Sequence, residues 1–240
     1  MNYPVKVLSI GPEIIELHWP EEISEAILFE ILTYKNWLNE RWGDKIQRMY
    51  QGYQVLGMQL KTGLTNESLV KELREQLNSP IPKPLRPPRV RSWKIPVCYE
   101  TALVPQLPLY LDRKSISWTR FVTLHTATLY RLYFYGFLPG FMYLGGLSED
   151  LFIPRKTIPD KKISAGSVAI GGRQTGVYPM DSPGGWYVVG KTPVSFFKNG
   201  ELQVPFRAGD SIRFESIPLA QFEELRQKET FCWTKWEDHG

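Results

Sequence analysis

The stretch YGFLPGFMYLGGL, residues 135–147, decides the fold of the second half of this 240-residue chain. It holds four glycines, one proline and four aromatic rings. Leu138-Pro139-Gly140 predicts a rigid turn, because proline fixes φ and glycine adopts positive φ without steric cost. An apolar turn of this kind between strands can form the wall of a ligand pocket. It can also form a buried barrel corner that binds nothing, and the composition alone favours that corner.

Strand-like segments surround this stretch. Residues 129–135 are rich in aromatic and bulky side chains, which is typical of a strand. After it, short runs of the same kind alternate with glycine and proline turns, a spacing typical of a β-barrel or β-sandwich. Helices are expected over residues 117–124, leading to His125, and over residues 218–228. The second half is therefore predicted to be a mainly-β domain, residues 95–240.

The first 78 residues follow a different pattern. Two short strands, residues 5–10 and 13–19, precede a helical repeat over residues 24–38. Residues 48–60 then read as two short strands or one kinked strand, and a second helical repeat covers residues 66–77. This order predicts a small α+β domain, residues 1–78.

A proline-rich segment separates the two predicted domains. Residues 79–89 contain five prolines, which favours an extended polyproline II conformation. We interpret residues 79–94 as a linker; a partner-binding segment and a strap along the second domain are the alternatives. The same sixteen residues carry five Lys or Arg and no acidic residue. Removing those five charges from the net charge of +4 leaves −1, so the basic excess is local and argues against nucleic-acid binding.

Location and metal content are also constrained by the sequence. The apolar runs are short and broken by charge, so no membrane-spanning segment is expected. The N-terminus shows no secretory signal. Cys98 and Cys232 form neither a disulfide framework nor a metal motif. We therefore expect a cytoplasmic protein without a bound metal, in which Cys98 is a small buried side chain rather than a nucleophile.

A series of motifs then identifies a family. GFLPGFMYL at 136–144, PR at 154–155, AGSVAI at 165–170, QTGVYP at 174–179, SPGGW at 182–186 and GKTP at 190–193 occur in one order. Together with IPVCY at 95–99 and His125, this series closely resembles the family of 5-oxoprolinase B subunits, also called KipI or allophanate hydrolase subunit 1. The resemblance implies a cyclophilin-like β-barrel in the C-terminal half and a small α+β domain before it.

The resemblance also implies an activity and partners. With the KipA-type C subunit and the A subunit of 5-oxoprolinase, the chain would open 5-oxo-L-proline to L-glutamate using ATP, with Mg as its companion ion, and would be inactive alone. Some members of the family are described as inhibitors of a histidine kinase, which would then be the partner. A third possibility, urea carboxyl transfer, follows from the allophanate-related members and would need a biotin-bearing domain.

Such chemistry needs cations that bind phosphate and carboxylate groups, and hydrogen-bond donors that stabilise an oxyanion. It also needs a side chain that transfers protons. The chain has no P-loop motif, so ATP is not expected to bind in that way. Arg155 and Lys156 are candidates to clamp a carboxylate or phosphate. His125 is the candidate for proton transfer. The structural alternatives are that Arg155 pairs with a carboxylate of the protein and that His125 fills a polar site in the core.

A glycine-rich segment completes the predicted site. Gln174 and Thr175 lie in residues 171–176, whose backbone amides are suited to an anion-binding concavity. Alternatively, these glycines only turn the chain. We expect all candidates to share one pocket, lined by Phe137, Phe141 and Tyr143.

Overall fold

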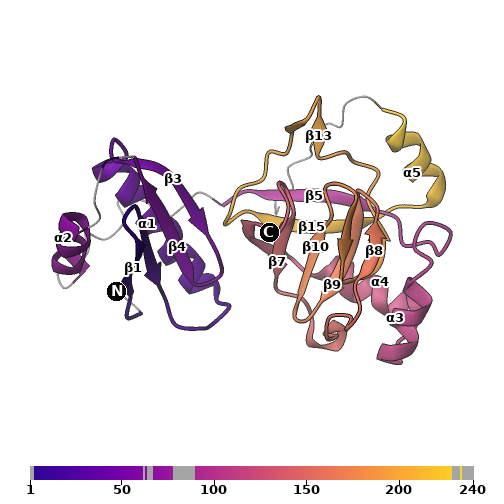
Figure 1. The fold of residues 1–240 in the computed structure, drawn as a ribbon. Coiled ribbons are helices and arrows are strands. Elements are labelled where there is room, and N and C mark those ends of the chain that lie inside the picture. The colour runs from indigo at the N-terminus through magenta and orange to yellow at the C-terminus, as the bar shows by residue number, and fades with distance from the viewer. Residues whose placement is uncertain (1–2, 62, 64–66, 78–89, 229–232, 234–240) are drawn as a thin grey trace. The chain divides into compact units, whose positions relative to one another are not determined.

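A computed structural model describes residues 3–61, 63, 67–77, 90–228 and 233 (Figure 1). The chain forms two compact units, residues 1–89 and residues 90–240. Most of the predicted linker, residues 79–89, lies outside the described residues. The last three residues of that linker, 92–94, belong to a strand instead. Pairing with residues 211–213 of a parallel neighbour holds them there.

The first unit combines a four-stranded sheet with two helices. Its elements are β1 (Lys6–Gly11), β2 (Ile14–His18), α1 (Glu25–Trp42), β3 (Ile46–Gln51), β4 (Val55–Leu60) and α2 (Glu67–Leu77). The strands are antiparallel in the order β1-β2-β4-β3. The core between α1 and the sheet contains Ile27, Ile31, Leu38, Leu56 and Met58.

The second unit is mostly β. Its helical elements are α3 (Leu107–Lys114), α4 (Trp118–Ala127), the 3-10 turn η1 (Glu149–Leu151) and α5 (Leu219–Arg226). Its strands are β5 (Ser92–Val97), β6 (Tyr130–Tyr135), β7 (Met142–Gly145), β8 (Asp160–Ile163), β9 (Ser167–Gly171), β10 (Gln174–Val177), β11 (Ser182–Gly184), β12 (Tyr187–Lys191), β13 (Phe197–Lys198), β14 (Glu201–Leu202) and β15 (Ser211–Ser216).

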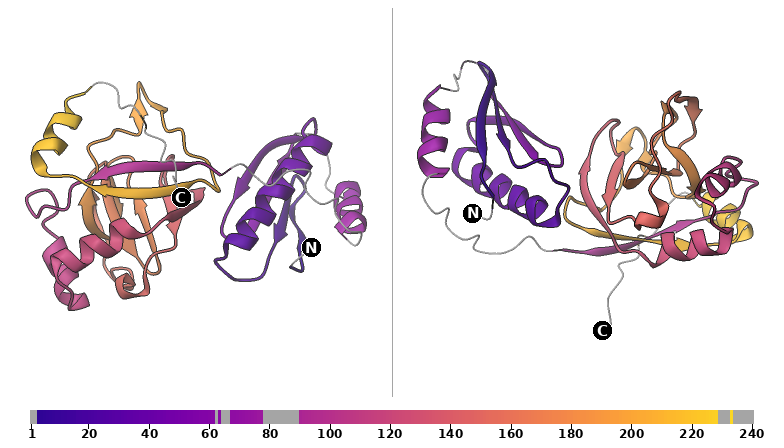
Figure 2. Two further views of the ribbon diagram at one scale, coloured as in Figure 1. Left: turned by 180° about the vertical axis from the view of Figure 1, so that it is seen from behind. Right: turned by 90° about the horizontal axis from the view of Figure 1, so that it is seen from below.

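Seven of these strands form a nearly closed, barrel-like sheet in the order β12-β9-β10-β7-β6-β15-β5. β5 and β15 run parallel, side by side (Figure 2), and the other neighbours are antiparallel. Cys98, just after β5, forms a bridge to Lys191 at the end of β12, with backbone hydrogen bonds of 2.8 Å in both directions. This bridge brings the two outer strands of the sheet together.

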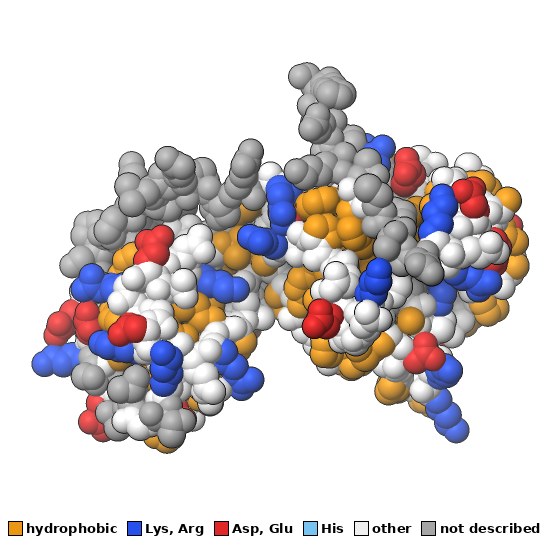
Figure 3. Space-filling view, turned by 90° about the horizontal axis from the view of Figure 1, so that it is seen from above, with side chains coloured by type: hydrophobic (Ala, Val, Ile, Leu, Met, Phe, Trp, Pro, Cys, Tyr) orange, Lys and Arg blue, Asp and Glu red, His pale blue; other side chains and the backbone are white. Residues whose placement is uncertain are grey.

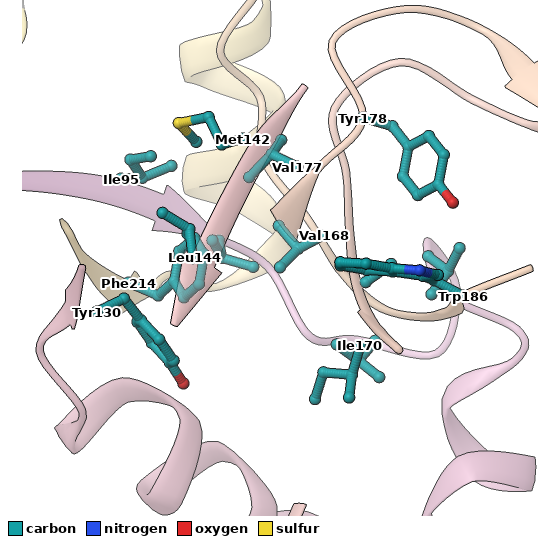
Figure 4. Close-up of a cluster of buried hydrophobic side chains, with 14 of the residues drawn as sticks. Ile95, Tyr130, Met142, Leu144, Val168, Ile170, Val177, Tyr178, Trp186 and Phe214 are labelled. Atoms are coloured by element: carbon teal, nitrogen blue, oxygen red, sulfur yellow. The ribbon is translucent and has the colours of Figure 1, made fainter. Parts of the chain in front are cut away.

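The interior of the barrel is filled by apolar side chains that alternate along the strands. Leu144, Val168 and Phe214 come from three different strands and are at most 1% exposed (Figure 4). The sequence prediction of many short strands in this half agrees with this arrangement. The first helix after β5, α3, was not among the predicted elements.

The stretch 135–147 contains the end of β6, the turn that follows it and the whole of β7. Phe141 donates its backbone N–H to the carbonyl of Leu138, which closes the expected turn. Gly140 has a φ of +82°, and a Cβ there would lie 2.5 Å from a methyl of Leu202. Phe137 has a φ of +61°, which is rare for a bulky residue, and the residue is 59% exposed. The turn is therefore a corner of the barrel with one aromatic side chain projecting from it.

A buried carboxylate, Asp210, connects the start of β5 to the start of β15. Asp210 is 2% exposed. One of its oxygens accepts hydrogen bonds from the Arg91 side chain at 2.8 Å, from Trp93 Nε1 at 3.0 Å and from the backbone N–H of Arg207 at 2.9 Å. The other oxygen accepts from the backbone N–H of Arg91 at 3.2 Å. Asp210 thus joins the two strands of the parallel pair where both begin.

The surface carries charges of both signs. On the face drawn in Figure 3, the described basic and acidic side chains are interspersed and form no continuous basic track. None of the helices in the described part of the chain is long and apolar enough to cross a membrane.

Candidate functional site

A pocket of about 540 Å³ opens on the second unit between α3, the loop that precedes β8, and β12. α3 supplies one wall and residues 153–160 supply the other. The lining consists of Gln106, Leu109, Arg113, Ile153, Pro154, Arg155, Lys156, Thr157, Ile158, Asp160 and Tyr187. This volume falls within the range typical of sites for small molecules. We call it the cationic pocket, because three cations and one carboxylate line it.

Lys156 is held in place by a polar network. Its Nζ lies 2.5 Å from Asp160 Oδ2 and donates to Gln106 Oε1 at 2.6 Å. Gln106 in turn donates its amide N–H to the same Asp160 oxygen at 2.8 Å. Burial alone would raise the pKa of Asp160, but the hydrogen bonds from Lys156 and Gln106 bring it below its usual value. Asp160 is therefore ionised at neutral pH and offsets the charge of Lys156.

Arg113 is a pocket residue that the sequence analysis did not identify. It lies in the last turn of α3, donates to the Tyr187 hydroxyl at 2.7 Å and lies 5.5 Å from the centre of that ring. The signals for α3 were a proline in its first turn and the basic pair Arg113-Lys114 in its last turn. No helix was predicted here, because prolines at positions 105 and 108 are more typical of a loop.

Arg155 lies in the cationic pocket, as expected for an anion clamp. Its side chain is exposed, and its guanidinium lies 5.5 Å from the centre of the Trp186 ring. In the described part of the chain, neither Arg155 nor Arg113 forms an ion pair with a carboxylate. The alternative that Arg155 pairs with a structural carboxylate therefore finds no support among the described residues.

The predicted aromatic lining lies in a separate layer. Phe141 packs edge-on against Tyr143 at 5.0 Å, Tyr178 at 4.9 Å and Trp186 at 5.4 Å, and Phe137 packs edge-on against Phe141 at 5.6 Å. This layer packs against the backbone at Gly176, where there is no room for a side chain. A Cβ on Gly176 would lie only 2.4 Å from the carbonyl oxygen of Met142. Phe137, Phe141 and Tyr143 thus support the Trp186 ring beneath Arg155 and do not line the cationic pocket.

His125 lies in the barrel core instead. It is fully buried, stacked 4.8 Å from Phe214 and 5.5 Å from Phe121. Its Nδ1 is 2.8 Å from the Tyr99 hydroxyl and its Nε2 is 3.2 Å from Thr175 Oγ1. Because the Thr175 hydroxyl donates to the carbonyl of Ala169 at 3.0 Å, its oxygen accepts from Nε2–H of His125. The pattern assigns a neutral ring that accepts a hydrogen bond from the Tyr99 hydroxyl at Nδ1.

This placement corrects the expectation of one shared pocket. His125 and Thr175 face the core, whereas Arg155 and Lys156 line the cationic pocket. Gln174 precedes Thr175 in β10 and therefore points to the opposite face of the sheet, where the residue is 8% exposed. Its Oε1 has no hydrogen-bond partner among the described residues. Proton transfer by His125 stays a prediction, and it would require the core around Thr175 to open.

The glycine-rich segment 171–176 contains the two-residue hairpin turn, Gly172-Arg173, that joins β9 to β10. Gly172 has a φ of +67° and donates its N–H to the carbonyl of Ile153 at 2.7 Å. That amide is therefore already occupied. No group of three metal-binding side chains occurs among the described residues.

Acid should destabilise the fold through His125. Burial lowers the pKa of His125 from 6.5 to about 3, so the unfolded chain takes up this proton first as the pH falls below 6.5. Well above that pH the proton has no effect on stability. Between pH 7 and pH 5 it lowers the free energy of unfolding by about 2 kcal/mol. Urea unfolding of the wild type and of His125→Gln at both pH values should show this extra loss in the wild type alone. Equal losses in the two proteins would contradict the neutral, buried assignment.

Comparison with known proteins places the chain in context. It matches the family model described as "Carboxyltransferase domain, subdomain C and D" over residues 5–206. Curated proteins named as the B subunit of 5-oxoprolinase match it at 40 to 45% identity. The one from Bacillus subtilis (strain 168) is 40% identical over 136 residues, which are 56% of this chain and 57% of that protein. The chain thus spans about half the length of the curated relatives it matches.

Solved structures show the same fold. A crystal structure of TTHA0988 has a TM-score of 0.72 at 29% identity, over 85% of this chain and 39% of that one. The urea carboxylase of Kluyveromyces lactis has a TM-score of 0.75 at 16% identity, over 92% of this chain and 22% of that one. At such low identity the second likeness concerns the fold alone.

Proposed function

The chain belongs to the family of carboxyltransferase domains, subdomain C and D, and on that premise we propose that it is the B subunit of an ATP-dependent 5-oxoprolinase. The complex would open 5-oxo-L-proline to L-glutamate together with a KipA-type C subunit and an A subunit. The support is the 40 to 45% identity to proteins named as 5-oxoprolinase B subunits. The proposal includes a cyclophilin-like barrel for the second unit and a cytoplasmic location.

The observation that carries this proposal is the cationic pocket. Both the ATP phosphates and the substrate carboxylate are anions, and both need fixed cations in a partly desolvated site. Arg155 supplies a guanidinium without an ion-pair partner among the described residues, and Asp160 fixes the position of Lys156. An exposed Arg155 is also available to a ligand that a second protein of the complex helps to hold.

In the proposed reaction ATP, as co-substrate with Mg, transfers its γ-phosphoryl group to the lactam oxygen and leaves as ADP. Water adds to the activated carbon, the C–N bond breaks and the nitrogen becomes the amine of glutamate. A second water then releases the phosphoryl group as inorganic phosphate and leaves the new carboxylate. The roles of this chain are to bind and orient the anionic groups through Arg155 and Lys156. The Trp186 ring of the aromatic layer packs against the Arg155 guanidinium at 5.5 Å and would help to orient it.

Reconstitution tests this proposal. We expect the purified chain alone to show no 5-oxoproline-stimulated ATP hydrolysis, and the same chain mixed with the A and C proteins to show it. The measurement is phosphate release with and without 5-oxoproline, accompanied by glutamate detection. A full complex that forms but never responds to 5-oxoproline would refute the proposal.

Two other functions predict different results in separate assays. A KipI-type inhibitor would block histidine kinase autophosphorylation when this chain is added alone. A component of a urea carboxyl-transfer enzyme would require a biotin-bearing partner and would respond to urea instead of 5-oxoproline. Affinity purification of the tagged chain from its host identifies which partner it binds.

A further inference from the structure

We infer that the cationic pocket takes an organic phosphate, with Arg113 and Arg155 as the two ligands of its dianionic phosphate group. The inference deepens the proposed function. Phosphate binding follows from the pocket residues themselves, and only the identity of the whole ligand rests on the proposed function. The geometry of the pocket favours this class over a simple carboxylate for three reasons.

The first reason is charge. Arg113, Arg155 and Lys156 line the pocket against one carboxylate, Asp160. Asp160 lies 2.5 Å from Lys156 and offsets that ammonium, so two guanidinium charges remain uncompensated among the described residues. A monocarboxylate would neutralise one of them. A phosphate monoester carries nearly two charges near neutral pH and would neutralise both.

The second reason is the supply of hydrogen-bond donors. The guanidinium groups present only donors. The Tyr187 hydroxyl accepts a hydrogen bond from Arg113 at 2.7 Å, which leaves its own hydrogen available to a ligand oxygen. Two side-chain acceptors of the lining, Asp160 and the Gln106 carbonyl, are both engaged by Lys156. Such a donor-rich site suits a group with three acceptor oxygens.

The third reason is the shape of the apolar wall. A pocket of about 540 Å³ is much larger than a phosphate group. Leu109 and Ile158 are 48% and 82% exposed and stand at the rim, and Ile153 and Pro154 extend the same apolar wall. Apolar side chains at a pocket mouth provide contact area for a carbon skeleton. The ligand therefore carries an organic body beside its phosphate.

Direct binding to the full chain tests this inference by calorimetry at about pH 8, where phosphate carries close to two charges. Inorganic phosphate should bind about tenfold more tightly than acetate, and added salt should weaken binding. Arg113→Met and Arg155→Met should each weaken phosphate binding by about tenfold. Arg120→Met is the matched control, because Arg120 is exposed, pairs with Asp150 and does not line the pocket.

Equal affinity for acetate and phosphate would overturn the inference, as would an equal loss of binding in Arg120→Met. ATP that displaces phosphate identifies a nucleotide as the phosphate source, and phosphate binding that ATP leaves unchanged identifies a smaller phosphorylated acid. A chain that binds phosphate within an inactive complex refutes the proposed function alone. An active complex whose chain binds acetate as tightly as phosphate refutes this inference alone.

Discussion

Replacing Arg155 by alanine is expected to lower the 5-oxoproline-dependent ATP turnover of the reconstituted complex by about 100-fold or more. The guanidinium is exposed, lines the cationic pocket and has no carboxylate partner among the described residues. Its removal takes away one of the two guanidinium groups proposed to hold the ligand, and Lys156 does not replace it, because Asp160 already engages Lys156.

The same substitution should leave the fold intact. The packing partner of Arg155 is the face of Trp186, and loss of an exposed cation–π contact costs less than about 1 kcal/mol. Arg120→Ala removes an equal charge outside the pocket and should retain full turnover. An active Arg155→Ala complex, or an inactive Arg120→Ala complex, would remove Arg155 from the proposed site. Urea unfolding of each purified chain serves as the check on folding.

Replacing Asp210 by asparagine is expected to destabilise the second unit by about 3 kcal/mol or more. The carboxylate is 2% exposed and accepts hydrogen bonds from Arg91, Trp93 and the backbone of Arg207. Asparagine would leave the Arg91 charge without its counter-ion and would place an amide N–H against groups that are themselves donors. β5 and β15 would lose the hydrogen bonds of Asp210 that connect them where both strands begin.

The measurement is urea unfolding followed by tryptophan fluorescence, read at the transition of the second unit. Asp150→Asn is the control, since its ion pair with Arg120 is exposed on both sides and contributes less than about 1 kcal/mol. If Asp210→Asn unfolded at the same urea concentration as the wild type, the buried carboxylate would not be a structural joint.

Much of the barrel could be predicted because its signals are local. The bulky, aromatic run in residues 129–135 and the turn at Leu138-Pro139-Gly140 depend on neighbours in the sequence, and β6 and this turn appear where expected. β7 lies within residues 135–147 and was not predicted as a separate strand. α3 was missed because two prolines near its start read as a loop. Proline is tolerated in the first turn of a helix, where its missing N–H has no intrahelical partner.

The site was harder to predict, because it depends on which face each side chain takes. Gln174 and Thr175 are consecutive in a strand, so they could not both line one cavity, and this follows from strand geometry alone. The burial of His125 could not be foreseen in this way. Phe121, one turn earlier in α4, stacks on one side of the ring, but Phe214 on the other comes from a distant strand.

The most direct test of the account observes the pocket arginines themselves. In side-chain nitrogen NMR spectra of the full chain, titration with inorganic phosphate should shift the Nε–H signals of Arg113 and Arg155 together and to saturation. The Arg120 signal should stay in place. Signals of Arg113 and Arg155 that remain unmoved, or that move no more than that of Arg120, would contradict anion recognition by the cationic pocket.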